Sequence, residues 1–183
     1  MALNQIVIKF NIMKNKIIIS VILLLISFCG FTQQQNSIKY SQVLINNNSI
    51  NQSKANLILN LNLFNTGEFY INELANEDAE IYIQNNSVSQ NPSQFYFKND
   101  KLYNFNLTDN QYYLNHSNIK VGNNISYVDI NYPLSFASKY EQDAMGFIII
   151  ELKMEDDSLS DEVIVINYNA ATEIITSIHI TSR

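Results

Sequence analysis

The sequence predicts an all-β domain, either an antiparallel sandwich or a half-open barrel of about ten short strands, after a cleaved signal peptide. Apolar and polar residues alternate along most of the chain, and a period of two is typical of half-buried strands. Short clusters of Asn, Ser and Asp separate the alternating segments and are expected to form turns. An apolar segment near the N-terminus, which resembles an export signal, precedes these strands.

The apolar segment is residues 13–32, MKNKIIISVILLLISFCGFT. It begins with two lysines, continues with an apolar run and ends in small or weakly polar residues before the polar chain starts at Gln33. A membrane-spanning helix needs about 20 apolar residues, so cleavage after Thr32 is expected rather than anchoring. We therefore assign residues 1–32 to an N-terminal extension and signal peptide, and residues 33–183 to a single β-rich domain.

Cys29 raises the alternative of a lipid anchor, because a lipid-modified cysteine follows the apolar run of a lipoprotein signal. The bulky Phe28 stands directly before it, where a small residue is expected. Cys29 is the only cysteine, so a chain cleaved after Thr32 has no disulfide and no thiol nucleophile.

In the first half of the domain, strands are expected where the alternation is clearest, at residues 37–45, 56–64, 68–72 and 80–84. Residues 56–64 give the clearest pattern, with Leu57, Leu59, Leu61 and Leu63 on one face. Residues 65–67 predict a hairpin turn. Residues 74–80 predict a short helical turn, and residues 85–94 a polar loop around Pro92.

The second half begins with an aromatic meander, in which residues 95–97 and 101–107 are strands joined by a turn at residues 99–100. Tyr103, Phe105 and Leu107 are expected on one side of the second strand. A short helix is expected within residues 135–145, and the run over residues 147–154 predicts a strand buried on both faces. Further strands are expected at residues 111–116, 124–132 (ended by Pro133), 163–168 and 173–181.

The charge balance excludes two classes of partner. From residue 33 onward the chain has eight basic and 17 acidic residues, a net charge of −9. Nucleic acids and anionic membrane surfaces attract basic proteins, so neither is an expected partner, and membrane contact is expected only through a lipid anchor on Cys29. The 28 asparagines, against four glycines, are expected to take the left-handed turn positions that glycine often fills.

Three segments resemble a family of exported proteins from Bacteroidota that is named for its GLPGLI peptide. They are Ile38-Lys39-Tyr40, residues 55–64 ending in Leu63-Phe64, and the tyrosine-rich stretch of residues 95–114. The naming peptide itself is absent, and residues 146–152 are its nearest counterpart. The resemblance implies an exported, β-rich protein and implies no catalytic residue.

The aromatic meander is the candidate ligand-binding surface. Tyrosine rings provide rigid contact area for a sugar or a peptide, and we assign this role to Tyr96, Tyr103, Tyr112 and Tyr113. A domain without tryptophan also needs aromatic residues in its core. We expect Phe97, Phe105 and Leu107 there.

The acidic segment 155–162 is the candidate metal site. Calcium is bound by six to eight oxygen ligands, and Glu155, Asp156, Asp157 and Asp161 offer several. The segment lacks the glycine and the spacing of a calcium-binding loop, so a solvated hairpin tip is the favoured interpretation, and no cofactor is expected. The two histidines, His116 and His179, have no metal-ligand spacing.

These observations predict an exported, non-catalytic protein that binds a protein or glycan partner or belongs to the cell envelope. Its expected location is the periplasm, the outer-membrane surface or the medium. Two alternatives stay open: a hydrolase acting on polysaccharide or peptide, and a lipid-anchored outer-membrane subunit. A contiguous exposed aromatic patch would favour binding, whereas the hydrolase requires a cleft with a histidine or a carboxylate pair.

Overall fold

The computed structural model describes residues 35–72, 77–85, 87 and 89–182, which belong to one compact unit. Nine strands form one large sheet: β1 (Ser37–Lys39), β4 (Leu63–Asn72), β5 (Glu77–Gln84), β6 (Gln94–Lys98), β7 (Lys101–Leu107), β8 (Tyr140–Gln142), β9 (Met145–Lys153), β10 (Leu159–Asn169) and β11 (Ile174–Ser182). The remaining elements are η1 (Tyr40–Gln42), the hairpin β2 (Leu44–Ile45) and β3 (Asn48–Ser49), α2 (Lys54–Leu61), α3 (Ser126–Asn131) and α4 (Pro133–Ala137).

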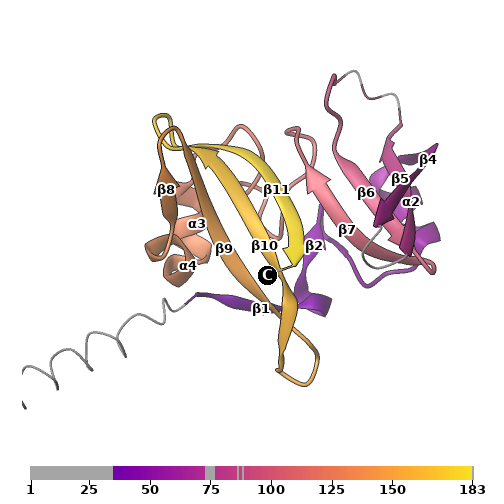
Figure 1. The fold of residues 1–183 in the computed structure, drawn as a ribbon, viewed down its shortest axis with the longest axis horizontal. Helices are drawn as coiled ribbons and strands as arrows, with labels where there is room; N and C mark the ends of the chain where they lie inside the picture. The colour runs from indigo at the N-terminus through magenta and orange to yellow at the C-terminus, as the bar shows by residue number, and fades with distance from the viewer. Residues whose placement is uncertain (1–34, 73–76, 86, 88, 183) are drawn as a thin grey trace, which may run out of the picture. The chain divides into compact units, whose positions relative to one another are not determined.

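The strands of the large sheet lie in the order β1-β9-β10-β11-β7-β6-β5-β4, and β8 pairs with β9 (Figure 1). All neighbours are antiparallel except β1, which runs parallel to β9. The two ends of this strand order, β1 and β4, are not paired with each other among the described strands. The all-β prediction is therefore confirmed, and the sheet stays open rather than closing into a barrel.

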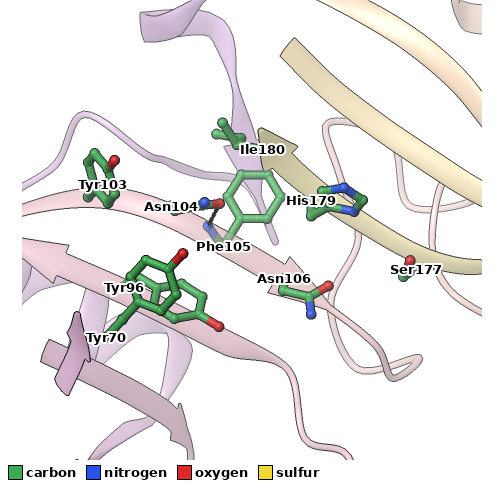
Figure 2. A pocket seen from close by; sticks show the side chains of 9 residues that line it. All are labelled: Tyr70, Tyr96, Tyr103, Asn104, Phe105, Asn106, Ser177, His179 and Ile180. Atoms are coloured by element: carbon green, nitrogen blue, oxygen red, sulfur yellow. Dashed lines mark hydrogen bonds between the residues drawn. The ribbon is translucent and has the colours of Figure 1, made fainter. Parts of the chain in front are cut away.

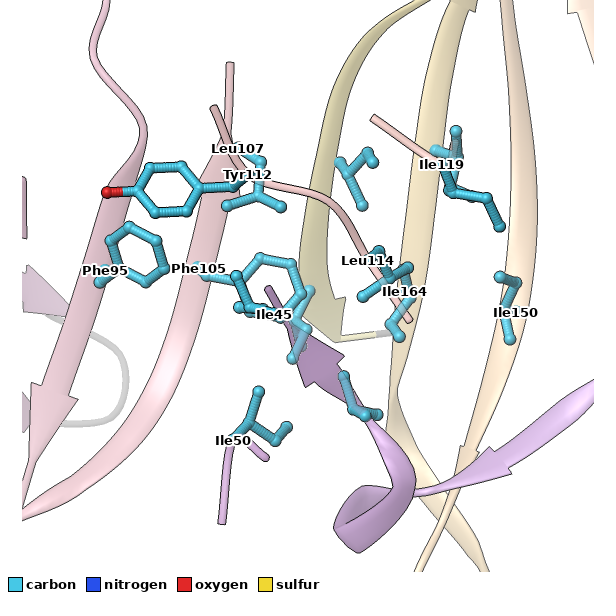
Figure 3. Close-up of a cluster of buried hydrophobic side chains, with 14 of the residues drawn as sticks. Ile45, Ile50, Phe95, Phe105, Leu107, Tyr112, Leu114, Ile119, Ile150 and Ile164 are labelled. Atoms are coloured by element: carbon cyan, nitrogen blue, oxygen red, sulfur yellow. The ribbon is translucent and has the colours of Figure 1, made fainter. Parts of the chain in front are cut away.

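The hydrophobic core lies on one face of the sheet. Figure 3 shows Phe95, Phe105, Leu107, Ile150 and Ile164 from the strands packed with Ile45, Ile50, Leu114 and Ile119 from the segments that cover this face. The predicted core residues Phe97, Phe105 and Leu107 are all buried, and burial stabilises the fold by about 1.5–3 kcal/mol for each such side chain.

Strand β9 alternates between fully buried and half-buried residues, so residues 147–154 are not buried on both faces, as the sequence suggested. The buried residues Ile148, Ile150 and Leu152 belong to the core. Ile149 lies on the opposite, partly exposed face. At β9, only one face of the sheet is therefore fully covered.

Residues 56–64 form no single strand, which corrects the clearest strand prediction. Helix α2 ends at Leu61, and β4 begins at Leu63. Leucine at every second position also places Leu57 and Leu61 four residues apart, and both are buried, whereas Leu59 is 79% exposed. The Ser53 hydroxyl accepts the Asn56 N–H at 3.4 Å, and Asn62 ends the helix in the left-handed conformation, so capping favours the helix.

Residues 124–132 were also predicted as a strand and instead contain helix α3. Pro133 then begins α4 at its first position, where its missing N–H costs nothing. Asn36 Oδ1 caps this second helix, because it accepts the N–H groups of Leu134 (2.9 Å) and Ser135 (3.2 Å). The cap comes from a residue almost a hundred positions away, which explains why local pattern did not reveal it.

Three smaller predictions are also corrected. Residues 65–67 form no hairpin turn but a bulge within the continuous strand β4, where the register shifts between Asn65 and Phe69. Strand β5 already begins at Glu77, so no helical turn extends to residue 80, and residues 73–76 lie outside the described residues. Residues 111–116 form no strand; Leu114 makes an isolated bridge with Ile45.

The asparagine turns agree with the sequence prediction. Asn99 and Asp100 both have positive φ, 48° and 59°, which is the conformation of a tight hairpin turn. Asn46, Asn47, Asn62 and Asn115 are left-handed as well. Asparagine therefore takes over positions that glycine fills in many other proteins.

Candidate functional site

The candidate site is a hollow of about 320 Å³ at the seam between β7 and β11, called here the seam hollow. Figure 2 shows its lining, in which β4 and β6 contribute tyrosines and β11 contributes residues on the other side of β7. The lining residues are Tyr70, Tyr96, Tyr103, Asn104, Phe105, Asn106, Ser177, His179 and Ile180.

The seam hollow exists because β7 and β11 pair over a very short distance. In the described structure their ladder consists of the pairs Leu107–Ile178 and Asn106–His179. If the β7–β11 ladder continued in the same register, Phe105 would pair with Ile180. These two residues are not paired in the described structure, and both line the hollow. The sheet is thus opened between residues 103–105 and residues 180–182.

A β-bulge places Tyr103 at the hollow. Tyr96 pairs with Asn104 and Phe97 pairs with Leu102, so Tyr103 is the extra residue on β7. Such an extra residue changes the direction of the side chains that follow. The prediction that Tyr103 shares a face with Phe105 and Leu107 is therefore wrong for Tyr103, and its assignment to the binding surface agrees with its place in this lining.

Tyr70 and Tyr96 form one wall of the hollow. Their rings meet edge to face, with centroids 5.5 Å apart and planes at 74°, a favourable aromatic arrangement. The Tyr96 hydroxyl donates to Gln94 Oε1 at 2.5 Å, and burial raises the pKa of Tyr96. Tyr96 is therefore held in place and remains protonated near neutral pH.

Amide and hydroxyl groups form the rest of the polar lining. Asn104 Oδ1 accepts the Phe105 N–H at 2.6 Å, the dashed line in Figure 2. Asn167 Nδ2 donates to Ser177 Oγ at 2.9 Å, and a hydroxyl that accepts one hydrogen bond still has its own proton to donate. These groups can therefore both donate to and accept from a ligand.

The seam hollow carries no formal charge. None of its nine described lining residues is Asp, Glu, Lys or Arg. His179 is half-buried, and burial lowers its pKa, so the imidazole is neutral at neutral pH. No described lining side chain offers an ionic ligand a counter-charge; Lys98, which is not a lining residue, has its Nζ 6.0 Å from the centroid of the Tyr103 ring. An uncharged ligand loses no ion hydration on entering.

Among the described residues, the arrangement around His179 lacks contacts that the hydrolase alternative requires. His179 does lie in a hollow, as that alternative requires. However, Ser177 and His179 share no hydrogen bond in the described structure, and the lining contains no carboxylate to orient the imidazole. A serine nucleophile requires both arrangements.

The four tyrosines singled out from the sequence do not gather in one place. Tyr96 and Tyr103 line the seam hollow. Tyr112 is only 2% exposed, donates to the Leu61 carbonyl oxygen at 3.3 Å and packs edge to face on Phe95. Its assignment to a binding surface is therefore corrected to a core position. Tyr113 lines a separate hollow of about 490 Å³ with Tyr127, His116 and several asparagines.

The acidic segment is tied to the N-terminal part of the domain. Lys39 Nζ lies 3.1 Å from Asp157 Oδ1 and donates to the Glu155 carbonyl oxygen, while Glu155 Oε1 accepts the Ser41 N–H. Hydrogen bonds from Ser158 lower the pKa of Asp156.

These carboxylates do not converge on a common point. Asp161 is exposed. Among the described residues, no group of three or more His, Cys, Asp or Glu side chains is placed to hold a metal ion. The calcium prediction for Glu155, Asp156, Asp157 and Asp161 therefore gains no support from the geometry.

Four polar or aromatic residues of the hollow were not predicted from the sequence: Tyr70, Asn104, Asn106 and Ser177. His179 was considered only as a metal ligand or a catalytic base. In the sequence, Ser177 and His179 alternate with isoleucines of the last strand, and Asn104 and Asn106 alternate with core residues of β7. What the sequence did not reveal is that β7 and β11 are neighbours. Tyr70 follows the bulge in β4, and this bulge decides its direction.

Cys29 and the expected export signal lie outside the described residues. Among the helices that the structure does describe, none has the length and apolar character needed to cross a bilayer. Comparisons of the chain with family models, with curated proteins and with solved structures found no match.

Proposed function

We propose that this protein is an exported binding protein whose seam hollow takes an uncharged ligand of the carbohydrate class. The observation that carries the proposal is the lining itself. Three tyrosines from three strands meet two asparagines, a serine and a neutral histidine in a hollow without formal charge.

Carbohydrate chemistry matches these groups. A sugar ring has apolar C–H faces, which pack on aromatic rings, and hydroxyl edges, which both donate and accept hydrogen bonds. Tyrosine offers a rigid aromatic surface, and amide and imidazole groups provide donors and acceptors together. A mostly apolar hollow with a few oriented polar groups is the usual form of a ligand site.

A peptide that pairs as an added strand fits the seam less well. Strand addition requires free backbone groups along a sheet edge. At the opened seam, the Phe105 N–H is already bonded to Asn104 Oδ1. Side-chain contacts, rather than backbone pairing, are therefore the recognition that this seam supports.

Export would bring the hollow into contact with envelope or environmental glycans. This part of the proposal depends on residues 13–32 and on the expected cleavage after Thr32. Mass spectrometry of the mature N-terminus distinguishes a chain starting at Gln33 from one with a lipid on Cys29, and an intact leader would contradict export.

The binding proposal is tested with a matched pair of tyrosine variants. Tyr70 lines the hollow and is 48% exposed, whereas Tyr140 lies on β8, outside the hollow, and is 49% exposed. Isothermal titration against neutral oligosaccharides is expected to show about tenfold weaker binding for Tyr70→Ala, ~1.4 kcal/mol, and little change for Tyr140→Ala. Equal losses in both variants, or no binding of any neutral sugar, would contradict the proposal.

A further inference from the structure

We infer that the ligand is a linear, uncharged oligosaccharide that lies along the β7–β11 seam and occupies a second hollow beside the first. This inference rests on the proposed function and specifies the class of its ligand. The second hollow, called here the amide hollow, has a volume of about 450 Å³. Its lining residues are Gln90, Asn91, Pro92, Gln94, Asn106, Thr108 and Thr176.

The two hollows are contiguous. Asn106 lines both of them. Gln94 lines the amide hollow, and its Oε1 accepts the hydrogen bond from Tyr96, which lines the seam hollow. A ligand that passes Asn106 therefore enters the second hollow without leaving the surface.

The common axis of the two hollows follows β7. Residues 103–106 of this strand line the seam hollow, and Asn106 and Thr108 line the amide hollow. A strand rises about 3.3 Å per residue, so the path from Tyr103 to Thr108 is about 17 Å long. That length exceeds a single pyranose ring and suits a chain of several sugars.

The kind of side chain that lines the groove changes along this path, but the described residues of both linings carry no formal charge. Tyrosine rings dominate the seam hollow, and amides and hydroxyls dominate the amide hollow. Neither lining contains Asp, Glu, Lys or Arg among the described residues. Apolar ring faces would thus bind at one end of the groove and hydroxyl edges at the other, and no cationic side chain of either described lining would pair with a polyanion.

Two local features shape the amide hollow. The Thr108 hydroxyl donates to the Asn91 carbonyl oxygen at 2.7 Å, which fixes the loop that forms one wall. On β11, Ser177 pairs with Asn167 and Ile175 pairs with Tyr168. Thr176 is therefore the extra residue of a bulge, and its exposed side chain lines the hollow.

The test compares the full chain with two variants of the amide hollow, Gln90→Ala and Thr176→Val. Thr181→Val is the matched control, because Thr181 is exposed on the same strand but lines neither hollow. The probes are ladders of cello-, xylo-, manno-, malto- and chito-oligosaccharides from two to six units, measured by isothermal titration.

At least one ladder is expected to bind about tenfold more tightly at five units than at two. Gln90→Ala and Thr176→Val are expected to weaken binding of the longer chain about fivefold and to leave the two-unit sugar unchanged. Thr181→Val is expected to change neither.

Two outcomes would overturn the inference, and they differ in what else they imply. If a ladder binds with the same affinity at every length, or if the two variants do not affect the longer chain, the amide hollow is not part of the site, while the proposed function stands. If no ladder binds, the proposed function fails together with the inference.

Discussion

His179 and Tyr96 are the ionisable side chains whose environment keeps the seam hollow uncharged. Burial lowers the pKa of the imidazole and raises the pKa of the phenol, and both changes favour the neutral form. A neutral imidazole has one donor and one acceptor nitrogen. The side chain is therefore suited to a ligand that is rich in hydroxyl groups.

The lowered pKa of His179 predicts a pH dependence of stability. Because the unfolded chain binds a proton at His179 more readily than the folded chain does, the contribution of His179 to stability is full above about pH 6.5 and declines as the pH falls. Urea unfolding between about pH 8 and pH 5 is thus expected to show that the wild-type protein loses stability relative to His179→Gln on acidification.

Two features make this comparison specific. Burial raises the pKa of Glu162, which gives a slope of opposite sign, but this slope is common to both proteins and cancels in the difference. His116→Gln replaces the exposed loop histidine and controls for the loss of an imidazole. If the wild-type protein kept the same stability relative to His179→Gln, or gained stability relative to it, as the pH falls, the burial of a neutral His179 would be contradicted.

Strands β9 and β10 illustrate how a close backbone contact fixes the packing of an element. Gly146 pairs with Tyr168, and a Cβ atom at residue 146 would overlap Cζ and the hydroxyl oxygen of the Tyr168 side chain. The Tyr168 hydroxyl in turn donates to Glu141 Oε1 at 2.8 Å. The glycine is required because the aromatic ring lies directly against the backbone.

Gly146→Ala is therefore expected to destabilise the fold by about 1–3 kcal/mol through overpacking. In a Tyr168→Val background the overlapping ring is gone, and most of the penalty is expected to disappear, which a double-mutant cycle measures by chemical unfolding. A penalty of the same size in both backgrounds would show that the ring contact is not its cause.

Helix α4 depends on a cap from the start of the described chain. Asn36 Oδ1 accepts the N–H groups of Leu134 and Ser135, and the Asn36 N–H donates to Ser135 Oγ at 2.9 Å. Asn36→Ala is expected to cost about 1–2 kcal/mol of unfolding free energy, because it removes the acceptor. Asn36→Asp keeps the acceptor and is the matched control.

The measurement is the unfolding free energy of the three proteins in urea. Asn36→Asp is expected to lie within about 0.5 kcal/mol of the wild-type protein. If the aspartate variant were as unstable as the alanine variant, the capping bonds would not explain the effect.

Alternation and turn residues were sufficient to predict the β class, the turn at residues 99–100, the last two strands, and the burial of Phe97, Phe105 and Leu107. These features depend on local pattern and on turn residues. Alternating leucines failed at residues 56–64 because such a run satisfies the helical spacing as well. The caps at Ser53 and Asn62 decide between the two structures.

The site was predictable only in part, because it depends on pairings between distant strands. The choice of tyrosines in the aromatic meander included Tyr96 and Tyr103, which line the seam hollow. The meeting of β7 with β11 joins segments about 70 residues apart, and no local signal encodes it. The bulge that redirects Tyr103 is likewise a property of the paired strands rather than of the sequence pattern.

The seam hollow is tested most directly as the binding site by NMR titration of the isotopically labelled protein with neutral oligosaccharides, which maps the ligand contacts. We expect the perturbed resonances to cluster at Tyr70, Tyr96, Asn104, Asn106 and His179. Perturbations confined to the separate hollow around Tyr113 and Tyr127, or no perturbation with any neutral sugar, would contradict the claim that the seam hollow is the binding site.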